Sequence, residues 1–523
     1  MALRSLTVLL ELGLVHYVLA ALLLGIIVWV WREGLKDDVK LEGIPEAPGA
    51  LPIIGHLHML GGRKGQNDAT IFSQWAKSVD SDLFSCRLGD QITVVVNTFS
   101  AAKDLWVTQS ASLLDRPQQP GFLDKLGVDI TGSPFTDQIR RCRAAAMRAL
   151  GKNMWPEYYQ LLKPSSEGLI VYLKEQGQSG KALVDIYPRL RIMLFDLGLS
   201  LTYGVRYGQF DDAFMDSFLT SILDITSVRA STANFRFYIR LLRWFPEPMS
   251  KTIAAEKVRA AHVKEIYQAY KDRVAQDGEV SCVVSSLGSD RLTEDEIHGT
   301  CLSLLQAAPD TVATALYQCI AFLASPDGNS FQTKMHDSIL ATYGGDRRLA
   351  WTNAFREEKV PLVTSLYKEA LRFYTVTPYS VPHQTTKEIH YKGRVIPRGV
   401  AVYMNAQQAN HDTAHFGQDA WSFNPERFVG NNSPMPHLGF GAGGRICPAM
   451  ALSNRILSAM LIRLSLAFEM KLGDPKAGAR VPILDPIDFS AVHTELVAAP
   501  RRFDCRFQPR DLKWLDELSL QLK

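Results

Sequence analysis

The sequence has no excess of charge of either sign, no paired cysteine motif and no internal repeat. Its 57 Lys and Arg residues against 54 Asp and Glu residues give a net charge of +3, which offers no support for a nucleic-acid-binding protein. The cysteines are scattered, odd in number and never spaced as Cys-x-x-Cys, which argues against a disulfide scaffold and a zinc ribbon. Hydrophobic residues make up 46% and charged residues 21%, which excludes a disordered, collagen-like or coiled-coil chain.

One long uncharged segment lies near the amino terminus, from Leu12 to Trp31. A helix that crosses a hydrocarbon core of about 30 Å needs about 20 apolar residues, and this segment is long enough. Arg32, Lys36 and Lys40 follow it, whereas only Arg4 precedes it, so the positive-inside rule places the rest of the chain in the cytosol. We therefore predict a single-pass transmembrane anchor over residues 12–31. A cleaved signal peptide and a buried core helix are the alternatives.

The domain organisation behind this anchor is predicted from composition. Residues 43–52 contain prolines at 45, 48 and 52, which disfavour a helix and stiffen the chain, so we expect a hinge there. An ordinary proline-rich linker predicts nearly the same behaviour. The length suggests about three domains at roughly 150 residues each. Because no break in composition follows residue 52, we expect residues 53–523 to form one large domain.

The spacing of hydrophobic residues predicts a mainly α-helical body with a small β portion. Most of residues 65–370 have apolar positions three and four residues apart, as in amphipathic helices. Residues 388–405 instead combine β-branched and aromatic residues with turn signals, which is typical of short strands. Residues 449–471 return to helical spacing.

A glycine-rich loop over residues 438–450 ends in Cys447. Its glycines allow a tight backbone, and Pro448 suits the first turn of a following helix. A sulfur at a helix N-terminus faces unpaired N–H groups and the positive end of the helix dipole, and both favour the thiolate. Such a thiolate suits an iron ligand or a nucleophile. A structural cysteine at a tight turn is the alternative.

The pattern Phe440-x-x-Gly443-x-Arg445-x-Cys447 resembles the haem-binding loop of the cytochrome P450 family. The resemblance implies the cytochrome P450 fold, haem as the cofactor and Cys447 as the thiolate ligand of its iron. It also implies that Phe440 packs over the ligand, that Gly443 permits the turn and that Arg445 pairs with a haem propionate. The chain departs from the family pattern at Ala449, where a glycine is expected.

Two further motifs follow the family order, Glu369-Ala370-Leu371-Arg372 and then Phe423-Asn424-Pro425-Glu426-Arg427-Phe428. Alone, a glutamate and an arginine three residues apart on a helix form a common solvated pair. The resemblance implies instead that Glu369, Arg372 and Arg427 form a structural ion network beneath the haem. In that role they are not catalytic, and their loss should prevent haem incorporation or folding.

Pro309, Asp310 and Thr311 lie where the family has a motif of small residue, acid and threonine on the oxygen side of the haem. Pro309 has no N–H, so the carbonyl of Leu305 loses its helical partner and the helix should kink. By resemblance, Asp310 and Thr311 are catalytic and deliver protons through hydroxyl and water. An ordinary helix break with Asp310 as a cap is the alternative. Ala308 replaces the usual glycine.

Weaker similarities concern the haem propionates and the substrate pocket. Arg143 resembles a helix arginine that meets a propionate, although Ile139 stands where a tryptophan is usual. His383 stands where arginine is common, and either donates to a propionate or lies on the surface. The substrate pocket is expected to draw on residues near 113–135, 210–245, 376–382 and 491–496.

The chain contains no recognisable flavin or nicotinamide motif, so we expect no fused reductase. The resemblance implies an NADPH-dependent cytochrome P450 reductase as the electron donor, with cytochrome b5 as a second candidate partner. Residues 140–148 carry Arg140, Arg141, Arg143 and Arg148, which are predicted to form a basic face toward an acidic reductase. A merely solvated helix face is the alternative.

Together these features predict a haem-thiolate monooxygenase similar to fungal microsomal cytochromes P450, in the endoplasmic reticulum membrane with a cytosolic catalytic domain. The expected substrate is an apolar small molecule, aromatic or multi-ring, and the unusual residues Ala308, Pro309 and Ala449 favour a tailoring step in secondary-metabolite biosynthesis. Residues 499–511 resemble phenylacetate-hydroxylase-like members, which suggests aromatic hydroxylation. Three hypotheses compete with this prediction: the same fold catalysing oxidative coupling, cyclisation or desaturation, a haem-binding sensor, and a membrane protein without haem.

Overall fold

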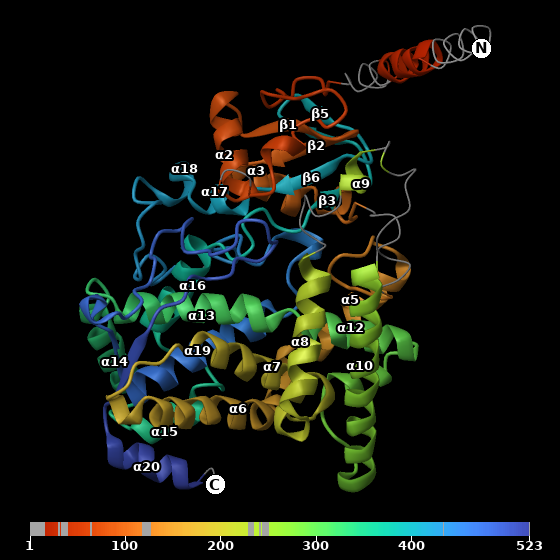
Figure 1. The fold of residues 1–523 in the computed structure, drawn as a ribbon. Coiled ribbons are helices and arrows are strands. Elements are labelled where there is room, and N and C mark those ends of the chain that lie inside the picture. Colours follow the sequence, from red (N-terminus) through yellow and green to blue (C-terminus); the bar gives the residue numbers. More distant parts are fainter. Residues whose placement is uncertain are drawn as a thin grey trace, which may run out of the picture.

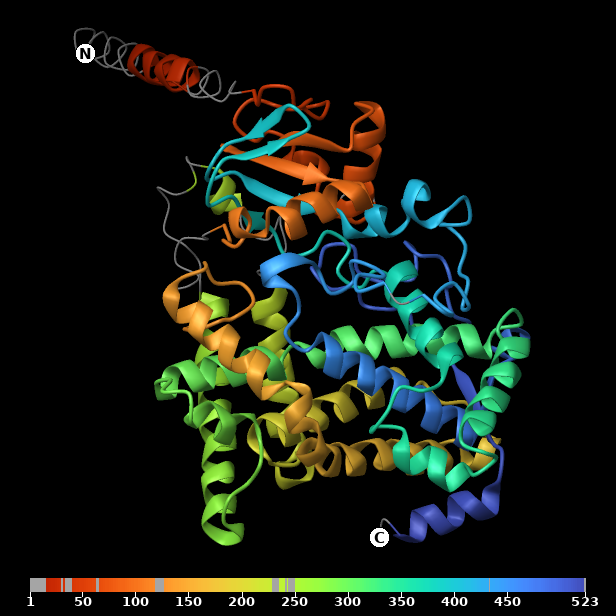
Figure 2. The same ribbon diagram turned by 180° about the vertical axis from the view of Figure 1, so that it is seen from behind.

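The computed structural model describes residues 16–29, 32, 40–62, 65–117, 127–227, 235–239, 242, 250–431 and 433–521. Several predicted features lie partly outside these residues: the anchor at 12–15 and 30–31, its flanking Arg4 and Lys36, and the substrate pocket at 118–126, 228–234, 240–241 and 243–245. The described chain has a large helical body, and the four-stranded sheet lies at the end that carries the N-terminal helix (Figures 1 and 2).

Helices build most of the body. Its central helix α13 packs against α7, α16 and α19, so apolar side chains cover it on all sides. The helices of the body are α5 (Asp137–Ala149), α6 (Trp155–Gln176), α7 (Tyr187–Tyr203), α8 (Asp212–Ser227), α10 (Ser250–Asp277), α11 (Val283–Gly288), α12 (Glu294–Leu305), α13 (Ala308–Ala324), α14 (Asn329–Thr342), α15 (Arg347–Asn353), α16 (Pro361–Phe373), α19 (Met450–Ala467) and α20 (Leu512–Gln521). Shorter helices lie with the strands: α2 (Asp68–Ser78), α3 (Phe99–Lys103), α9 (Phe235–Tyr238), α17 (Ala406–Asn410) and α18 (Thr413–Phe416).

The main sheet has four strands in the order β1-β2-β6-β3. β1 and β2 are antiparallel, β2 and β6 are parallel with Thr93 opposite Ala401, and β3 is antiparallel to β6. Two hairpins, β4 with β5 and β7 with β8, complete the β portion. The strands are β1 (Leu83–Leu88), β2 (Gln91–Val96), β3 (His383–Gln384), β4 (Ile389–Tyr391), β5 (Arg394–Ile396), β6 (Ala401–Met404), β7 (Phe468–Leu472) and β8 (Cys505–Pro509).

The strands predicted over residues 388–405 are confirmed as β4, β5 and β6. The prediction of helix was wrong for β1 and β2, which lie inside the stretch 65–370. Their signal is local, because Gly89 turns the chain with a φ of +62° and a run of β-branched residues follows in β2. The helix predicted to Lys471 also ends earlier, at Ala467, where β7 begins.

The proline-rich segment packs directly on the sheet. The Ala47 N–H donates to the Ser85 carbonyl at 2.8 Å, and the Ser85 N–H donates to the Pro45 carbonyl at 2.8 Å. The Glu46 carboxylate also pairs with Arg87 at 2.9 Å. These contacts hold residues 45–47 along β1. The domain boundaries at 43–52 and 53–523 stay predictions.

Among the described residues, one helix is long and apolar enough to cross a membrane by composition, Met450–Ala467, and 78% of it is buried inside the protein. It is therefore a core helix. The described part of the N-terminal segment, His16–Trp29, is a shorter apolar helix whose large side chains, such as Leu24 and Ile26, are exposed. A helix with exposed apolar side chains is favoured in an apolar medium such as a lipid bilayer, which is consistent with a membrane anchor.

Two buried histidines lie between the sheet and the helical body. His411 at the end of α17 stacks on Trp421 with ring centroids 4.2 Å apart, and its Nδ1 lies 2.8 Å from the Gln407 carbonyl oxygen. His437 accepts a hydrogen bond from the Gly439 N–H at 3.0 Å. Burial lowers the pKa of His411 to about 4 and the pKa of His437 to about 3.

These shifts predict acid destabilisation below about pH 6.5, which continues to about pH 4 for His411 and about pH 3 for His437. Above the ordinary histidine pKa of 6.5 both states are neutral, but below it the unfolded chain takes up protons that the folded chain excludes. The free energy of unfolding should therefore fall as pH falls, by up to roughly 1.4 kcal/mol per pH unit for each histidine. Denaturation of the holoprotein between pH 7.5 and 5 should show a shallower pH dependence in His411→Asn. The exposed control His390→Asn should match wild type, and an unchanged slope in His411→Asn would contradict this account.

Candidate functional site

Cys447 lies at the end of a tight loop that leads into α19. The Cys447 N–H donates to the Phe440 carbonyl at 3.0 Å, and the Ile446 N–H donates to the Gly443 carbonyl at 3.1 Å. Gly443 has a φ of +69°, and a Cβ at this position would lie 1.9 Å from the carbonyl oxygen of Trp106. A side chain does not fit there, so the glycine allows the loop to pass close to the segment around Trp106.

The environment of Cys447 differs from that of the other cysteines. Cys447 as a residue is half-buried, whereas all the other cysteines are buried. Burial raises the pKa of Cys447, and the Ala449 N–H and the charge of Arg143 oppose this effect. The Ala449 N–H at the helix end favours the thiolate, as the sequence predicted. Burial favours the neutral thiol and has the larger effect in the protein without a bound group. A bound metal ion would be needed to reverse the balance.

Three buried arginines, Arg116, Arg143 and Arg445, converge beside the loop. Arg143 comes from α5, Arg445 from the loop itself and Arg116 from the segment that follows Leu113. Their side chains donate to backbone carbonyls: Val381, Pro382 and Thr131 for Arg116, Ile130 and Ile446 for Arg143, and Leu114, Thr131 and Ser133 for Arg445. None of the three has a carboxylate partner within 4.0 Å in the described part of the chain.

The charges of these arginines are poorly compensated. Burial and then the charge of Arg143 lower the pKa of Arg445 to about 10, and burial followed by Arg445 and Arg143 lowers the pKa of Arg116. Two buried donors, Arg445 Nε and Trp106 Nε1, have no hydrogen-bond partner among the described residues. Unpaired cations and orphaned donors next to a half-buried cysteine fit a group that carries two carboxylates and a metal, as haem does.

His383 belongs to the same cluster. It is buried, its Nδ1 lies 2.5 Å from the Leu113 carbonyl oxygen, and its ring meets Trp106 edge-on with centroids 5.4 Å apart. Burial, followed by the charge of Arg116, lowers the pKa of His383 well below its ordinary value and so favours the neutral imidazole. The alternative that His383 is a surface residue is wrong.

Sequence reasoning missed Arg116 and Trp106. Ile139 stands where a tryptophan was expected on α5, and the indole beside His383 is that of Trp106, which lies outside α5. The sequence feature that could have identified Arg116 is the pair Asp115-Arg116, which directly follows two leucines and precedes Pro117. No sequence signal distinguished Trp106 from an ordinary core tryptophan.

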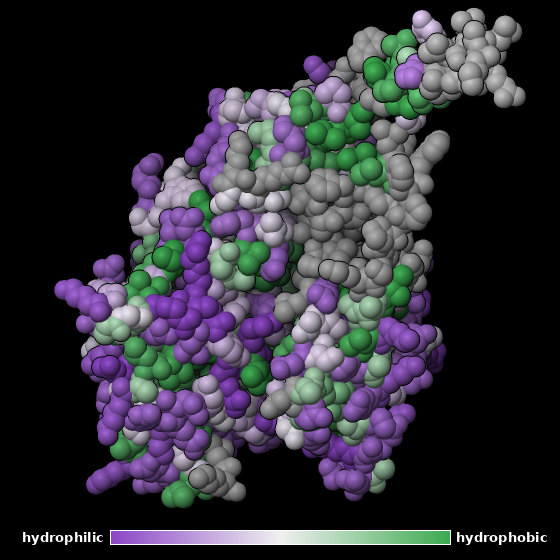
Figure 3. Space-filling model, in the orientation of Figure 1, coloured by the Kyte–Doolittle hydropathy of each residue, from purple (hydrophilic) through white to green (hydrophobic). Residues whose placement is uncertain are grey.

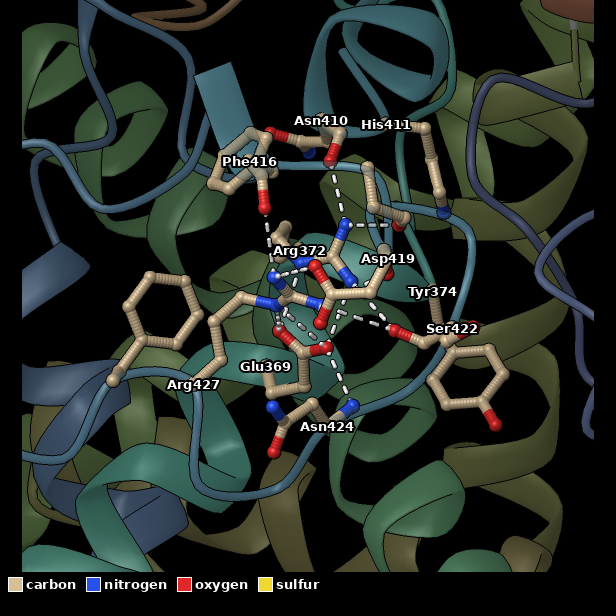
Figure 4. A network of polar contacts seen from close by, with 12 residues as sticks. Glu369, Arg372, Tyr374, Asn410, His411, Phe416, Asp419, Ser422, Asn424 and Arg427 are labelled. Atoms are coloured by element: carbon tan, nitrogen blue, oxygen red, sulfur yellow. Dashed lines mark hydrogen bonds and ion pairs between the residues drawn. The ribbon is translucent and has the colours of Figure 1, made fainter. Parts of the chain in front are cut away.

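The structure brings Glu369, Arg372 and Arg427 together (Figure 4). On α16, the Nε and Nη2 atoms of Arg372 each donate to one carboxylate oxygen of Glu369 at 2.7 Å, and both side chains are 0% exposed. Arg427 Nε lies 3.2 Å from Glu369 Oε2, and the Asn424 N–H donates to Glu369 Oε1 at 2.8 Å. The buried carboxylate therefore has four donors.

The same network ties α16 to the segment between α17 and the Cys447 loop. Arg372 Nη1 donates to the carbonyls of Asn410 and Ala420, each at 2.7 Å. Arg427 pairs with Asp419 at 2.9 Å, and this hydrogen bond lowers the pKa of Asp419 (Figure 4). Bidentate pairing and backbone acceptors satisfy the buried guanidinium group of Arg372, which is the condition for a buried ion pair to persist.

The predicted break before Pro309 is present, since α12 ends at Leu305 and α13 begins at Ala308. Asp310 Oδ1 accepts a hydrogen bond from Arg191 Nε on α7 at 2.8 Å, and the Thr311 hydroxyl donates to the Ala307 carbonyl at 2.8 Å. Asp310 pairs with another helix and does not cap α13, so the alternative of a helix cap is wrong.

A second carboxyl group lies near Asp310. Burial and then the charge of Asp310 raise the pKa of Glu495, and the charge of Arg191 opposes this shift. Glu495 falls within the range 491–496 that we expected to border the pocket. The pairing of Arg191 with Asp310 joins α7 to α13 across 119 positions of sequence and had no local signal.

The prediction of a basic face on α5 was wrong. Arg143 points inward, and each exposed arginine of this helix has an acidic partner. The pairs are Arg140–Asp137 at 2.9 Å, Arg141–Glu296 at 2.7 Å and Arg148–Asp290 at 2.8 Å. This surface is therefore much closer to neutral than the sequence indicated.

Comparisons with known proteins agree with this site. The family model described as Cytochrome P450 matches residues 45–482. Phenylacetate 2-hydroxylase from Emericella nidulans is 34% identical over 93% of this chain and 95% of its own length, and 3-hydroxyphenylacetate 6-hydroxylase from the same organism is 28% identical over 92% of each. A zebra fish cytochrome P450 solved with abiraterone superposes with a TM-score of 0.67 over 85% of this chain and 100% of its own, at 20% identity, which confirms the predicted fold. The chain therefore belongs to the cytochrome P450 family.

Proposed function

We propose that this cytochrome P450 monooxygenase hydroxylates the aromatic ring of a phenylacetate-like small molecule. As a member of the family, the chain oxidises a small molecule with electrons from a reductase. The single observation that carries the finer proposal is its 34% identity, over 93% of its length, to a protein named phenylacetate 2-hydroxylase. The relative named 3-hydroxyphenylacetate 6-hydroxylase supports the same substrate class.

Cys447 provides the thiolate that holds the family's haem cofactor. When bound, haem supplies the activation of dioxygen and the insertion of one oxygen atom into the substrate. We assign Arg143, Arg445 and the newly found Arg116 to the haem propionates, because these buried cations have no carboxylate partner among the described residues. In this assignment Phe440 and Gly443 shape the loop, and the ion network of α16 supports it from behind.

Asp310 and Thr311 are assigned to proton delivery on the oxygen side. The gap between α12 and α13 places the Ala307 carbonyl within 2.8 Å of the Thr311 hydroxyl, so this hydroxyl has a defined position at the start of α13. The ion pair with Arg191 fixes the position of Asp310, the residue before Thr311. When the Asp310 carboxylate turns away from Arg191, it would take up a proton from solvent water and pass that proton to a water beside Thr311. Arg191 and Glu495 are positioning residues in this scheme.

Thr311→Ala should separate electron use from product formation. Without the hydroxyl, proton transfer slows, and we expect product formation to fall by about 10²-fold, the lower end of general acid–base contributions. NADPH oxidation should continue and yield hydrogen peroxide. Thr311→Ser keeps the hydroxyl and serves as the matched control, with coupling close to wild type. The ratio of product to NADPH measures the effect, and unchanged coupling in Thr311→Ala would refute the assignment of Thr311 to proton delivery.

The substrate class is tested by binding and turnover with the purified holoprotein. Phenylacetate and 3-hydroxyphenylacetate should shift the Soret band of the ferric protein, whereas a multi-ring hydrocarbon should not. Turnover with a reductase and NADPH should yield a monohydroxylated acid. A coupled dimer, a cyclised product or a product lacking two hydrogens would favour coupling, cyclisation or desaturation, and turnover of multi-ring compounds alone would favour a secondary-metabolite tailoring step.

We also propose that residues 12–31 anchor the chain in the endoplasmic reticulum membrane, with the domain of residues 53–523 in the cytosol. The exposed apolar helix His16–Trp29 supports this, and hydrophobic side chains gather beside it on the strand end of the molecule (Figure 3). An NADPH-dependent cytochrome P450 reductase and cytochrome b5 are the partners expected there. Alkaline carbonate extraction of membranes should leave the chain in the pellet, and its release would contradict the anchor.

A further inference from the structure

The helices α6, α15 and α20 lie at the end of the molecule opposite the N-terminal helix (Figures 1 and 2). A separate cavity lies between them. Its volume is about 230 Å³. This is below the roughly 300–1,000 Å³ of sites for drug-sized ligands, so it suits a molecule with a single ring. The match to the family model ends at residue 482, so α20, which forms one wall, lies beyond the matched region.

Aromatic side chains form the apolar part of this cavity. Trp351 of α15 meets Trp514 of α20 edge-on, with ring centroids 5.1 Å apart. The guanidinium of Arg463, from α19, lies over Trp351 at 4.7 Å and over Phe355 at 4.9 Å. Arg463 therefore covers part of these two buried rings, Trp514 is more exposed than they are, and the lining combines aromatic surface with positive charge.

Arg463 is a buried cation whose side chain is not fully satisfied. It is 2% exposed, and its Nε has no hydrogen-bond partner among the described residues. Its distance to the Glu167 carboxylate is long, at 3.9 Å, and Glu167 also accepts a hydrogen bond from the Trp351 indole N–H at 3.2 Å. Burial lowers the pKa of Arg463 to about 10, so it still carries its charge at neutral pH.

The rest of the lining adds uncommitted positive charge. The other acidic side chain, Glu517, is paired with Arg348 at 2.7 Å. Lys163 and Arg356 also line the cavity, and neither has an ion-pair partner within the described ranges. Both are exposed at its mouth, so an anion could reach them from solvent without a desolvation cost as large as that of a buried site.

We propose that this cavity binds a single-ring aromatic carboxylate, with the ring against Trp351, Phe355 and Trp514 and the carboxylate on Lys163 and Arg356. The site is distinct from the haem site, and it does not depend on the proposed ring hydroxylation. Four basic side chains against two acidic ones favour an anion over a neutral ring, and the aromatic walls favour a flat ring over an inorganic anion.

Ligand-observed ¹⁹F NMR of the holoprotein with 4-fluorobenzoate tests this proposal, with the haem pocket blocked by an azole that coordinates the iron. We expect 4-fluorobenzoate to bind under these conditions and the neutral 4-fluorobenzyl alcohol to bind at least fivefold more weakly. The double variant Lys163→Gln/Arg356→Gln should lose at least fivefold in affinity for the benzoate. The matched double variant Arg506→Gln/Lys513→Gln removes two exposed cations that do not line the cavity and should bind as wild type does.

Three results would overturn the proposal. The first is equal benzoate affinity in the two double variants, and the second is equal binding of the benzoate and the alcohol. The third is loss of benzoate binding when the azole is present, since that would locate the ligand at the haem. None of these results bears on the hydroxylation of phenylacetates, which is measured by product formation.

Discussion

Replacement of Cys447 by alanine should abolish the red-shifted Soret band of the reduced carbon-monoxide complex. That band requires an axial thiolate, and Cys447 is the one cysteine in the chain that is not buried. The loop itself should persist, because its contact at this residue is the backbone N–H donated to Phe440, which alanine retains. We therefore expect a folded protein that has lost most of its haem, with circular dichroism close to wild type.

The control for this variant is Cys142→Ala on α5, close to the arginine cluster. Cys142 is buried and its substitution removes one sulfur atom from the core, so a small loss of stability is expected with the spectrum intact. A thiolate-type band that persists in Cys447→Ala would show that the iron ligand is another residue.

Glu369→Gln should remove about 3–5 kcal/mol from the free energy of unfolding. The substitution leaves Arg372 buried at 0% exposure without its carboxylate, and breaking a buried ion pair in this way is expensive. Since domains are typically stable by only about 5–15 kcal/mol, much of the variant should be unfolded or unable to hold haem. The yield of haem-loaded protein and its thermal midpoint measure the loss.

Glu426→Gln, next to Arg427, is the matched control. Its carboxylate pairs with Lys334 at 2.6 Å, but the side chains are 43% and 56% exposed, so the loss should stay below about 1 kcal/mol. Arg372→Lys is informative as well, because lysine keeps the charge but cannot reproduce the paired contacts and should be intermediate. Equal stability of Glu369→Gln and Glu426→Gln would show that the network is not a structural requirement.

The parts of the site that could be predicted from sequence are those in short motifs. The loop before Cys447 carries its own glycines, and Gly443 is required by a close backbone approach that the pattern anticipates. Glu369 and Arg372 are three residues apart on one helix, so their pairing is local. Their link to Arg427 crosses 58 positions and depended on the resemblance, since spacing alone does not reveal it.

The rest depended on tertiary packing. The direction of Arg143 is set by how α5 packs on the loop, and the acidic partners of Arg141 and Arg148 lie on or near α12, far along the chain. For the same reason, local composition could not reveal Arg191 as the partner of Asp310. The strands β1 and β2 differ from these cases, because Gly89 and the β-branched run of β2 are local signals, and only the parallel pairing of β2 with β6 depended on tertiary packing.

Turnover of phenylacetate under ¹⁸O₂ tests the central claim most directly. The holoprotein, a cytochrome P450 reductase and NADPH are incubated with the acid, and the product is analysed by mass spectrometry. A monohydroxylated phenylacetate that carries one ¹⁸O atom on its ring is the predicted result. A hydroxylated product without ¹⁸O, or consumption of NADPH with no oxidised phenylacetate, would contradict the account.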